Sequence, residues 1–140
     1  MEIDPRGPRF GAVITTVVLA AVLVTGSPWL LAAQVAVFAV GALAGLRYAP
    51  YGFLYRRLIR PRLGPPAHTE AEAPPRFAQA VGMVIAGVGV ICLAAGATVA
   101  GLVCTALALA AAFLNAAFDL CLGCQVYLFI QRNQRVRPSA

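Results

Sequence analysis

The chain has 140 residues, of which 61% are hydrophobic and only 11% are charged, and its formal net charge is +6. Soluble domains carry about 25% charged residues, so this composition excludes an ordinary water-facing surface, and the apolar content excludes disorder. The 4 Cys are too sparse for a secreted disulfide scaffold. Because a membrane helix takes about 20 residues, the composition predicts an all-α membrane protein with four spans in one domain, residues 1–140.

Four apolar runs predict the membrane helices, at about residues 10–25, 29–46, 77–95 and 99–118. Only a short turn at residues 25–28 separates the first two runs, and an equally short turn at residues 95–98 separates the last two. Each pair is therefore predicted to form a tight helical hairpin. Residues 47–76 would then be a linker and residues 125–140 a tail.

The positive charge comes entirely from arginine, since the chain has eleven Arg and no Lys. None lies at a hairpin turn; they are Arg6, Arg9, Arg47, Arg56, Arg57, Arg60, Arg62, Arg76, Arg132, Arg135 and Arg137. Positively charged flanks stay on the cytoplasmic side of a membrane. The pattern predicts a multi-pass protein of the inner (plasma) membrane with the linker, the tail and both termini in the cytoplasm. Because the chain has no soluble basic face, we exclude nucleic acid as its partner, and we expect the arginines to lie beside the lipid bilayer.

Short motifs repeat between the two halves of the chain. Pro-Arg-Phe at residues 8–10 precedes the first run and recurs at residues 75–77 before the third, and residues 51–55 (YGFLY) are echoed by residues 125–129 (QVYLF). The repeats predict an internal duplication, in which two tandem hairpins have the same orientation. A cleaved signal peptide over residues 1–26 is the alternative. The repeats and the immediately following second run favour a retained first helix.

A segment with aromatic, aliphatic and basic residues follows the second run, at residues 51–59, and precedes a Pro-rich linker. This mixture is typical of a short helix that lies on the membrane surface, with Arg56 and Arg57 toward anionic headgroups. It fits equally well the frayed end of the second span. Both interpretations stay open.

Small residues spaced four apart indicate where membrane helices approach closely. Gly41 and Gly45 form a GxxxG step in the second run, and Gly82 stands four residues before Ala86 in the third. We predict that these glycines pack helices within the bundle. A homo-oligomer formed through Gly41 and Gly45 is the alternative.

Polar residues interrupt the last two runs near their predicted cytoplasmic ends. Gln79 lies near the start of the third run, and Asn115 and Asp119 lie one helical turn apart at the end of the fourth. Polar groups are costly inside a membrane and are usually paired there. We predict a structural polar cluster in which Gln79 and Asn115 share a hydrogen bond and Asp119 is solvated.

Cys121 and Cys124 follow the last run with a spacing that brings two thiols within disulfide reach, and they are the candidate catalytic redox pair. A preceding helix C-terminus and the nearby Asp119 disfavour a thiolate. A thiolate is favoured instead if Gly123 breaks the helix, because Cys124 then begins a second, interfacial helix that runs through Ile130. The sequence leaves this local geometry open.

The remaining candidate ligands are few. Cys92 and Cys104 fit small buried residues, although a bridge between them near the turn at residues 95–98 is conceivable. The two CxxC thiolates and His68 make three ligands, whereas structural zinc takes four. We therefore predict no metal site and no cofactor within one chain; zinc bound by a dimer that shares two CxxC pairs is the alternative.

Three stretches carry a resemblance to a known family: residues 4–10 (DPRGPRF), residues 74–79 (PPRFAQ) and residues 115–127, which include NAAF and the CLGC element. Together they resemble a family of small bacterial membrane proteins whose domain has no known function. The resemblance implies four membrane helices, a Cys-x-Gly-Cys element after the last, and no established activity. Relatives often stand beside thioredoxin-like and thiosulfate-sulfurtransferase proteins, which implies thiol or sulfur chemistry. Asp119 departs from the small or apolar residue that is usual there.

Three functions fit these observations. The first is a thiol-redox or sulfur-relay component, in which Cys121 and Cys124 exchange electrons or sulfur with a cytosolic thioredoxin-like or rhodanese-like protein. The alternatives are a non-catalytic accessory subunit of a larger membrane complex and a permease for a small sulfur compound, which would need an oligomer. No Ser-His-Asp set, phosphate-binding glycine loop or buried carboxylate pair is present for conventional soluble-enzyme chemistry.

Overall fold

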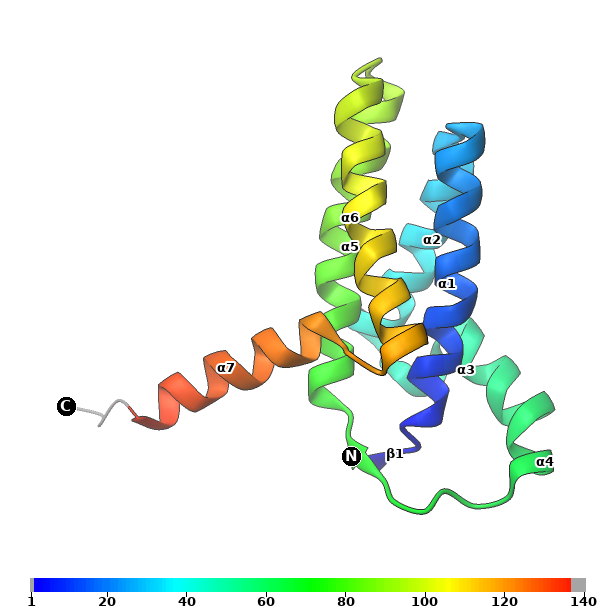
Figure 1. The fold of residues 1–140 in the computed structure, drawn as a ribbon, viewed down its shortest axis with the longest axis vertical. Helices are drawn as coiled ribbons and strands as arrows, with labels where there is room; N and C mark the ends of the chain where they lie inside the picture. Colours follow the sequence, from blue (N-terminus) through cyan, green and yellow to red (C-terminus); the bar gives the residue numbers. More distant parts are fainter. Residues whose placement is uncertain (1, 137–140) are drawn as a thin grey trace.

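The computed structural model describes residues 2–136, and these are almost entirely helical (Figure 1). The longer helices are α1 (Arg6–Thr25), α2 (Pro28–Ala39), α5 (Ala73–Ala94), α6 (Thr98–Phe118) and α7 (Leu122–Val136). The shorter elements are a π-helical turn (Val40–Ala44), a 3-10 turn (Leu46–Tyr48), α3 (Pro50–Leu54), a second π-helical turn (Tyr55–Ile59) and α4 (Arg60–Leu63). Two short strands, β1 (Glu2–Ile3) and β2 (Glu70–Ala71), pair antiparallel. The all-α class is confirmed.

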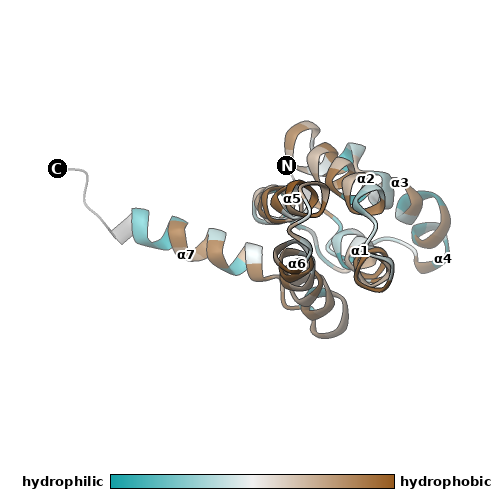
Figure 2. Cartoon of the chain, turned by 90° about the horizontal axis from the view of Figure 1, so that it is seen from above, coloured by the Kyte–Doolittle hydropathy of each residue, from teal (hydrophilic) through white to brown (hydrophobic). Residues whose placement is uncertain are grey.

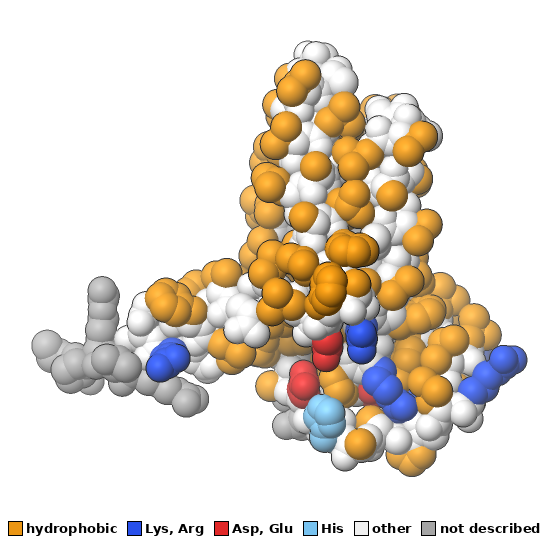
Figure 3. Space-filling model, in the orientation of Figure 1, with side chains coloured by type: hydrophobic (Ala, Val, Ile, Leu, Met, Phe, Trp, Pro, Cys, Tyr) orange, Lys and Arg blue, Asp and Glu red, His pale blue; other side chains and the backbone are white. Residues whose placement is uncertain are grey.

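Four helices form a bundle, in which α1 packs chiefly on α6, and α2 on α5 (Figures 1 and 2). The core consists of Leu19, Val22, Leu31, Phe38, Ala86 and Ala108. The outer surface is also apolar: Val17, Val84 and Leu107 are 65%, 61% and 59% exposed. Such a large apolar surface is expected to face lipid. On the face drawn in Figure 3, the charged side chains lie away from the hairpin turns. We call their end, where α1 and α5 begin and α6 ends, the arginine-rich end.

Three of the helices, α1, α5 and α6, are long and apolar enough to cross a membrane. The second predicted span is shorter, since α2 has 12 residues and the π-helical turn that continues it has 5. At 1.5 Å per residue this helix is roughly 25 Å long, against a hydrocarbon core of about 30 Å. It ends at Ala44, two residues before the predicted end, because Gly45 has φ 118°, a backbone conformation that favours glycine. A fourth span remains a prediction.

The two hairpins make corresponding contacts at the arginine-rich end. Arg9 Nε of α1 donates to the carbonyl of Ala116, near the end of α6, at 3.2 Å. Arg76 of α5 donates from Nε to the carbonyl of Ala42 at 2.7 Å and from Nη2 to that of Leu43 at 2.9 Å, at the end of the second helix. A cation is stabilised by the carbonyls at a helix C-terminus. Each Pro-Arg-Phe motif thus ties the start of one hairpin to the end of the other.

The phenylalanines of the two motifs also have matching partners. Phe10 lies against Tyr55 with ring centroids 5.8 Å apart, and Phe77 lies against Tyr127 with centroids 5.6 Å apart. Tyr55 belongs to the helical segment that follows the first hairpin, and Tyr127 belongs to α7, which follows the second. Figure 2 shows these two segments on opposite sides of the bundle. Each hairpin is therefore followed by a helix that packs on its first helix.

Residues 51–59 belong to a separate helical segment, from Pro50 to Leu63, which Gly45 and the 3-10 turn divide from α2. The interpretation of this segment as the frayed end of the second span is therefore wrong. Tyr51 lies 3.5 Å from where a Cβ on Gly11 would be, and Tyr55 lies 3.5 Å from that position on Gly7. The two tyrosines thus dock the segment on one face of α1.

Candidate functional site

The cysteine pair lies where α6 gives way to α7, at the arginine-rich end. α6 ends at Phe118, and Asp119 adopts the left-handed conformation (φ 55°, ψ 30°) with its N–H on the carbonyl of Asn115 at 3.1 Å. Asp is one of the few residues besides Gly that tolerate this conformation. α7 then begins at Leu122 and extends sideways from the bundle (Figure 1). Of the alternatives that the sequence leaves open, a break at Gly123 does not occur: the chain breaks before Leu122, and Gly123 lies inside α7.

Cys121 directly precedes α7, and Cys124 lies in its first turn. The two form a disulfide with their Cα atoms 5.1 Å apart, and both are half-buried. The N–H of Cys124 donates to Sγ of Cys121 at 3.2 Å, which is the bond that an N-cap side chain accepts from the helix. The positive end of a helix dipole favours a thiolate. Of the two local geometries that the sequence leaves open, the dithiol thus has the one that favours a reactive sulfur.

Gly123, between the two cysteines, lets α7 cross α5 at close range. A Cβ at this position would lie 2.6 Å from both Cα and Cβ of Ala78, closer than real Cβ contacts allow. Four residues further along α7, Tyr127 packs on Phe77. The dithiol is therefore held against the start of α5.

The predicted hydrogen bond between Gln79 and Asn115 does not occur among the described residues. The side chain of Gln79 lies instead against the π-helical turn that follows α2, 3.1–3.3 Å from where a Cβ on Gly41 would be. Gly41 leaves the room that this side chain fills, so Gln79 turns away from α6. Asp119, the third member of the predicted cluster, is exposed. The predicted pairing of Gln79 with Asn115 is therefore wrong.

The other predicted packing glycines have different roles. A Cβ on Gly82 would lie 3.0–3.1 Å from the ring of Phe38, so this glycine admits an aromatic ring between α5 and α2. Gly45 lies outside the helix, and a Cβ there would lie 3.2 Å from Oε1 of Glu72. That oxygen accepts the N–H of Leu46 at 2.9 Å, which holds the turn after α2. Homo-oligomer formation stays a prediction.

The remaining cysteines and the histidine lie apart from this pair. Cys92 and Cys104 are free thiols, and Cβ of Cys104 lies 3.3 Å from the Cβ position of Gly89. His68 Nε2 pairs with Glu70 Oε1 at 3.5 Å in the linker. Among the side chains that the structure describes, no three His, Cys, Asp or Glu come together as metal ligands.

Comparison with known proteins places the chain in a family. The sequence profile of the family described as "Domain of unknown function (DUF4395)" matches residues 3–132. The chain belongs to the DUF4395 family. The match spans the bundle, the dithiol and most of α7. No curated protein and no solved structure matches this DUF4395 chain, so its chemistry is argued from its own geometry.

This DUF4395 protein also contains a buried polar chain that was not predicted from the sequence. Gln34 of α2 is only 1% exposed. Its Nε2 donates to Oγ1 of Thr15 on α1 at 3.4 Å, and its Oε1 accepts the hydroxyl of Tyr51 on α3 at 2.7 Å. A lone Gln within an apolar run needs such partners, because an unpaired amide is costly there. That Gln was the available signal, while nothing in the pattern pointed to Tyr51, which follows the hairpin.

Asp4, also missed, anchors the N-terminal segment. Its carboxylate accepts the backbone N–H of Arg6 at 3.0 Å, the Arg6 guanidinium at 3.0–3.1 Å and the hydroxyl of Tyr55 at 3.0 Å. Burial raises the pKa of Asp4, but the hydrogen bonds from Arg6 and Tyr55 outweigh burial and leave that pKa below its ordinary value of 3.8. Burial, and then the Asp4 carboxylate, raise the pKa of Tyr55 above its ordinary value of 10.0.

We expect acid to weaken the fold through Asp4. The lowered pKa makes the ionised carboxylate stabilising above pH 3.8, and this stabilisation is lost as the pH falls through the lower pKa of the folded state. Asp4→Asn should therefore be less stable than wild type at pH 7. It should also lose less stability than wild type when the pH falls from about 5 to about 3, the range in which the Asp4 carboxylate takes up its proton. Thermal unfolding in detergent measures the difference. The exposed Asp119→Asn is the control, and equal acid sensitivity of Asp4→Asn and wild type would contradict this role.

Proposed function

We propose that this DUF4395 protein is a membrane-embedded thiol-redox component that exchanges its Cys121–Cys124 disulfide with a cytosolic thioredoxin-like protein. The observation that carries the proposal is the position of Cys121 at the N-terminus of α7, with the N–H of Cys124 on its Sγ. A thiolate on Cys121 keeps that hydrogen bond and interacts with the positive end of the helix dipole. It is therefore a better nucleophile at neutral pH and a better leaving group than an ordinary thiol.

The exchange balances within the two dithiols. A thiolate of the reduced partner attacks Sγ of Cys121; a mixed disulfide forms, the bond between Cys121 and Cys124 breaks, and Cys124 leaves with the electron pair. The second thiolate of the partner then attacks the partner's own sulfur in the mixed disulfide, and Cys121 leaves as a thiolate. Two electrons have moved from the partner, which now holds a disulfide, to Cys121 and Cys124. The reverse sequence oxidises this pair again.

A sulfur relay uses the same thiolate. A rhodanese-like partner that carries a persulfide would pass its outer sulfur to Cys121, so that Cys121 becomes the persulfide and the partner cysteine becomes a thiolate. The added mass of one sulfur on Cys121 distinguishes this outcome from a mixed disulfide.

We also propose the membrane arrangement. Residues 28–44 form a fourth, shorter span, the two hairpins are a tandem duplication, and the arginine-rich end with both termini faces the cytoplasm from the inner membrane. The location of the arginines at one end of the bundle supports the orientation, and the matching contacts of Arg9 and Arg76 support the duplication. Val126, Phe129 and Ile130 are exposed at helical spacing on α7, as in a helix that lies on a membrane surface.

Trapping of the mixed disulfide tests the proposed chemistry. Cys124→Ser leaves Cys121 without a resolving thiol, and the partner must lack one too. In proteoliposomes the variant should accumulate a mixed disulfide with a thioredoxin whose second cysteine is replaced by Ser and whose first is activated as a disulfide with thionitrobenzoate, which leaves when Cys121 attacks. Cys121→Ser leaves only Cys124, which lies within the first turn of α7 and not at its N-terminal end, and we expect about tenfold slower trapping. Cys104→Ser, a bundle cysteine, is the control and should behave as wild type.

Two outcomes would contradict the proposal. Equal trapping by Cys121→Ser and Cys124→Ser would remove the role of the helix end, and no trapping by either would remove the exchange. The orientation is tested separately in whole cells. Labelling of Cys124 in the Cys121→Ser variant by an impermeant maleimide would place the arginine-rich end outside.

A further inference from the structure

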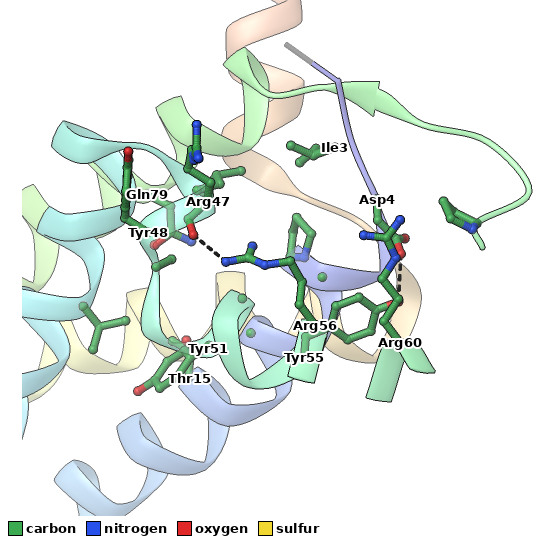
Figure 4. A pocket seen from close by; sticks show the side chains of 18 of the residues that line it. Ile3, Asp4, Thr15, Arg47, Tyr48, Tyr51, Tyr55, Arg56, Arg60 and Gln79 are labelled. Carbon is green, nitrogen blue, oxygen red and sulfur yellow. Dashed lines mark hydrogen bonds between the residues drawn. The ribbon is translucent and has the colours of Figure 1, made fainter. Parts of the chain in front are cut away.

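A cavity of about 570 Å³ opens at the arginine-rich end, on the side of the bundle where α3 lies (Figure 4). One wall is the face of α1 that carries Gly7, Gly11 and Thr15, spaced four residues apart. Tyr51 and Tyr55 line it from the segment after the first hairpin. Its volume lies in the range of small-molecule sites, about 300–1,000 Å³.

Arginine dominates the charge of this cavity. Arg47, Arg56 and Arg60 line it, and the lining carboxylate, Asp4, is already paired with Arg6. The side chains that the structure describes form two salt bridges, Arg6–Asp4 and His68–Glu70, and neither of them involves a lining arginine. Their guanidinium groups present donors in a fork that matches the oxygens of a phosphate or sulfate group. The cavity therefore has an uncompensated positive charge.

One of these arginines is held in place. Arg56 Nη2 donates to the backbone carbonyl of Arg47, and the guanidinium reaches across the cavity in Figure 4. Its guanidinium lies beside Gly52, where a Cβ would be in ordinary contact with Arg56 Nη1 at 3.6 Å and closer, at 3.3 Å, to the carbonyl of Leu46. A positioned arginine binds an anion with less loss of side-chain entropy than a free one.

A second polar group comes from another helix. Gln79 of α5 lines the cavity, and its carboxamide makes no hydrogen bond to another described residue. Thr15, at the inner end, and Tyr51 are already engaged by Gln34. The available donors are thus the arginines and the Gln79 amide.

We propose that this cavity binds a tetrahedral oxoanion group, a phosphate or a sulfate, held by Arg56 and Arg60 with the Gln79 amide as a further donor. The group comes either from a free ion or small ester, or from the headgroup of an anionic lipid. The site is independent of the dithiol and of the thiol exchange proposed for it.

The test is thermal unfolding of the full chain in neutral detergent. Sulfate, phosphate and glycerol 3-phosphate should each be compared with sodium chloride at matched ionic strength. Arg56→Gln and Arg57→Gln are neighbours that lose the same charge, but Arg57 lies over the ring of Phe53, with Cζ 5.4 Å from the ring centroid, and does not line the cavity. We expect about tenfold weaker binding in Arg56→Gln, in line with a charged hydrogen bond, and wild-type binding in Arg57→Gln.

Further arms separate the sources and guard against misfolding. Arg60→Gln removes an exposed side chain, so it should weaken binding without a folding defect. Nanodiscs of phosphatidylcholine with added phosphatidylglycerol test the lipid source. A rise of the unfolding midpoint in these nanodiscs that Arg56→Gln loses, together with no response to free ions, identifies a lipid headgroup as the ligand. Cys121→Ser should respond as wild type does. Equal losses in Arg56→Gln and Arg57→Gln, or no response in any arm, would overturn the proposal.

Discussion

Gly123→Val is expected to lift α7 off α5 and to cost about 1–3 kcal/mol of stability, as overpacking does. The new Cβ would lie 2.6 Å from Cα as well as Cβ of Ala78, and a backbone atom cannot rotate away. The start of α7 must shift as a whole, and it carries Cys121 and Cys124 with it. Thiol exchange should slow even though both thiols are still present.

The matched control is Gly87→Val on α5, where nothing lies within 4 Å of the added Cβ. It makes the same change of side chain within a helix and adds no clash. Cross-linking reads the contact directly: with the four native Cys replaced by Ser, cysteines introduced at Phe77 and Tyr127, whose rings lie 5.6 Å apart, should join efficiently. Gly123→Val should abolish this cross-link and Gly87→Val should not. An undiminished cross-link in Gly123→Val would show that α7 tolerates the side chain.

The bundle was predictable because each long helix depends on local apolar composition. The predicted runs at residues 77–95 and 99–118 correspond to α5 and α6 with ends that differ by a few residues. The end of α2 was not predictable in the same way. Gly41 and Gly45 look alike in the sequence, yet one lies in the π-helical turn against Gln79 and the other leaves the helix with φ 118°. Tertiary contacts distinguish them.

The dithiol shows the same limit. Gly is the commonest residue in left-handed backbone, so Gly123 was one position at which the sequence allowed a break between helices. The chain uses Asp119 there, and Gly123 is needed for a close crossing with α5. Whether Cys121 ends one helix or begins the next depends on this choice, which spacing alone does not reveal. The CxxC motif was visible in the sequence; its electrostatic environment was not.

Gln34→Glu is expected to be strongly destabilising at pH 7, by roughly 3 kcal/mol, the order found for a charge at the centre of a membrane helix. Gln34 is 1% exposed, and its two described partners, Thr15 and Tyr51, bring no positive charge to balance a carboxylate. Near pH 4 the introduced carboxyl takes up a proton and has the shape and hydrogen bonding of the amide. The cost should then largely disappear, so stability is lost as the pH rises.

Two variants separate the charge from the hydrogen bonds. Gln34→Leu removes the bonds without adding charge and should cost about 1 kcal/mol, because hydrogen bonds inside membrane bundles are worth little net. Gln125→Glu adds the same charge at an exposed position of α7 and should be nearly neutral. Thermal unfolding at both pH values ranks the three. If Gln34→Glu matched Gln125→Glu at pH 7, water must reach Gln34 past Thr15 and Tyr51, which line the cavity at the arginine-rich end. The buried chain would then be the inner wall of a hydrated site.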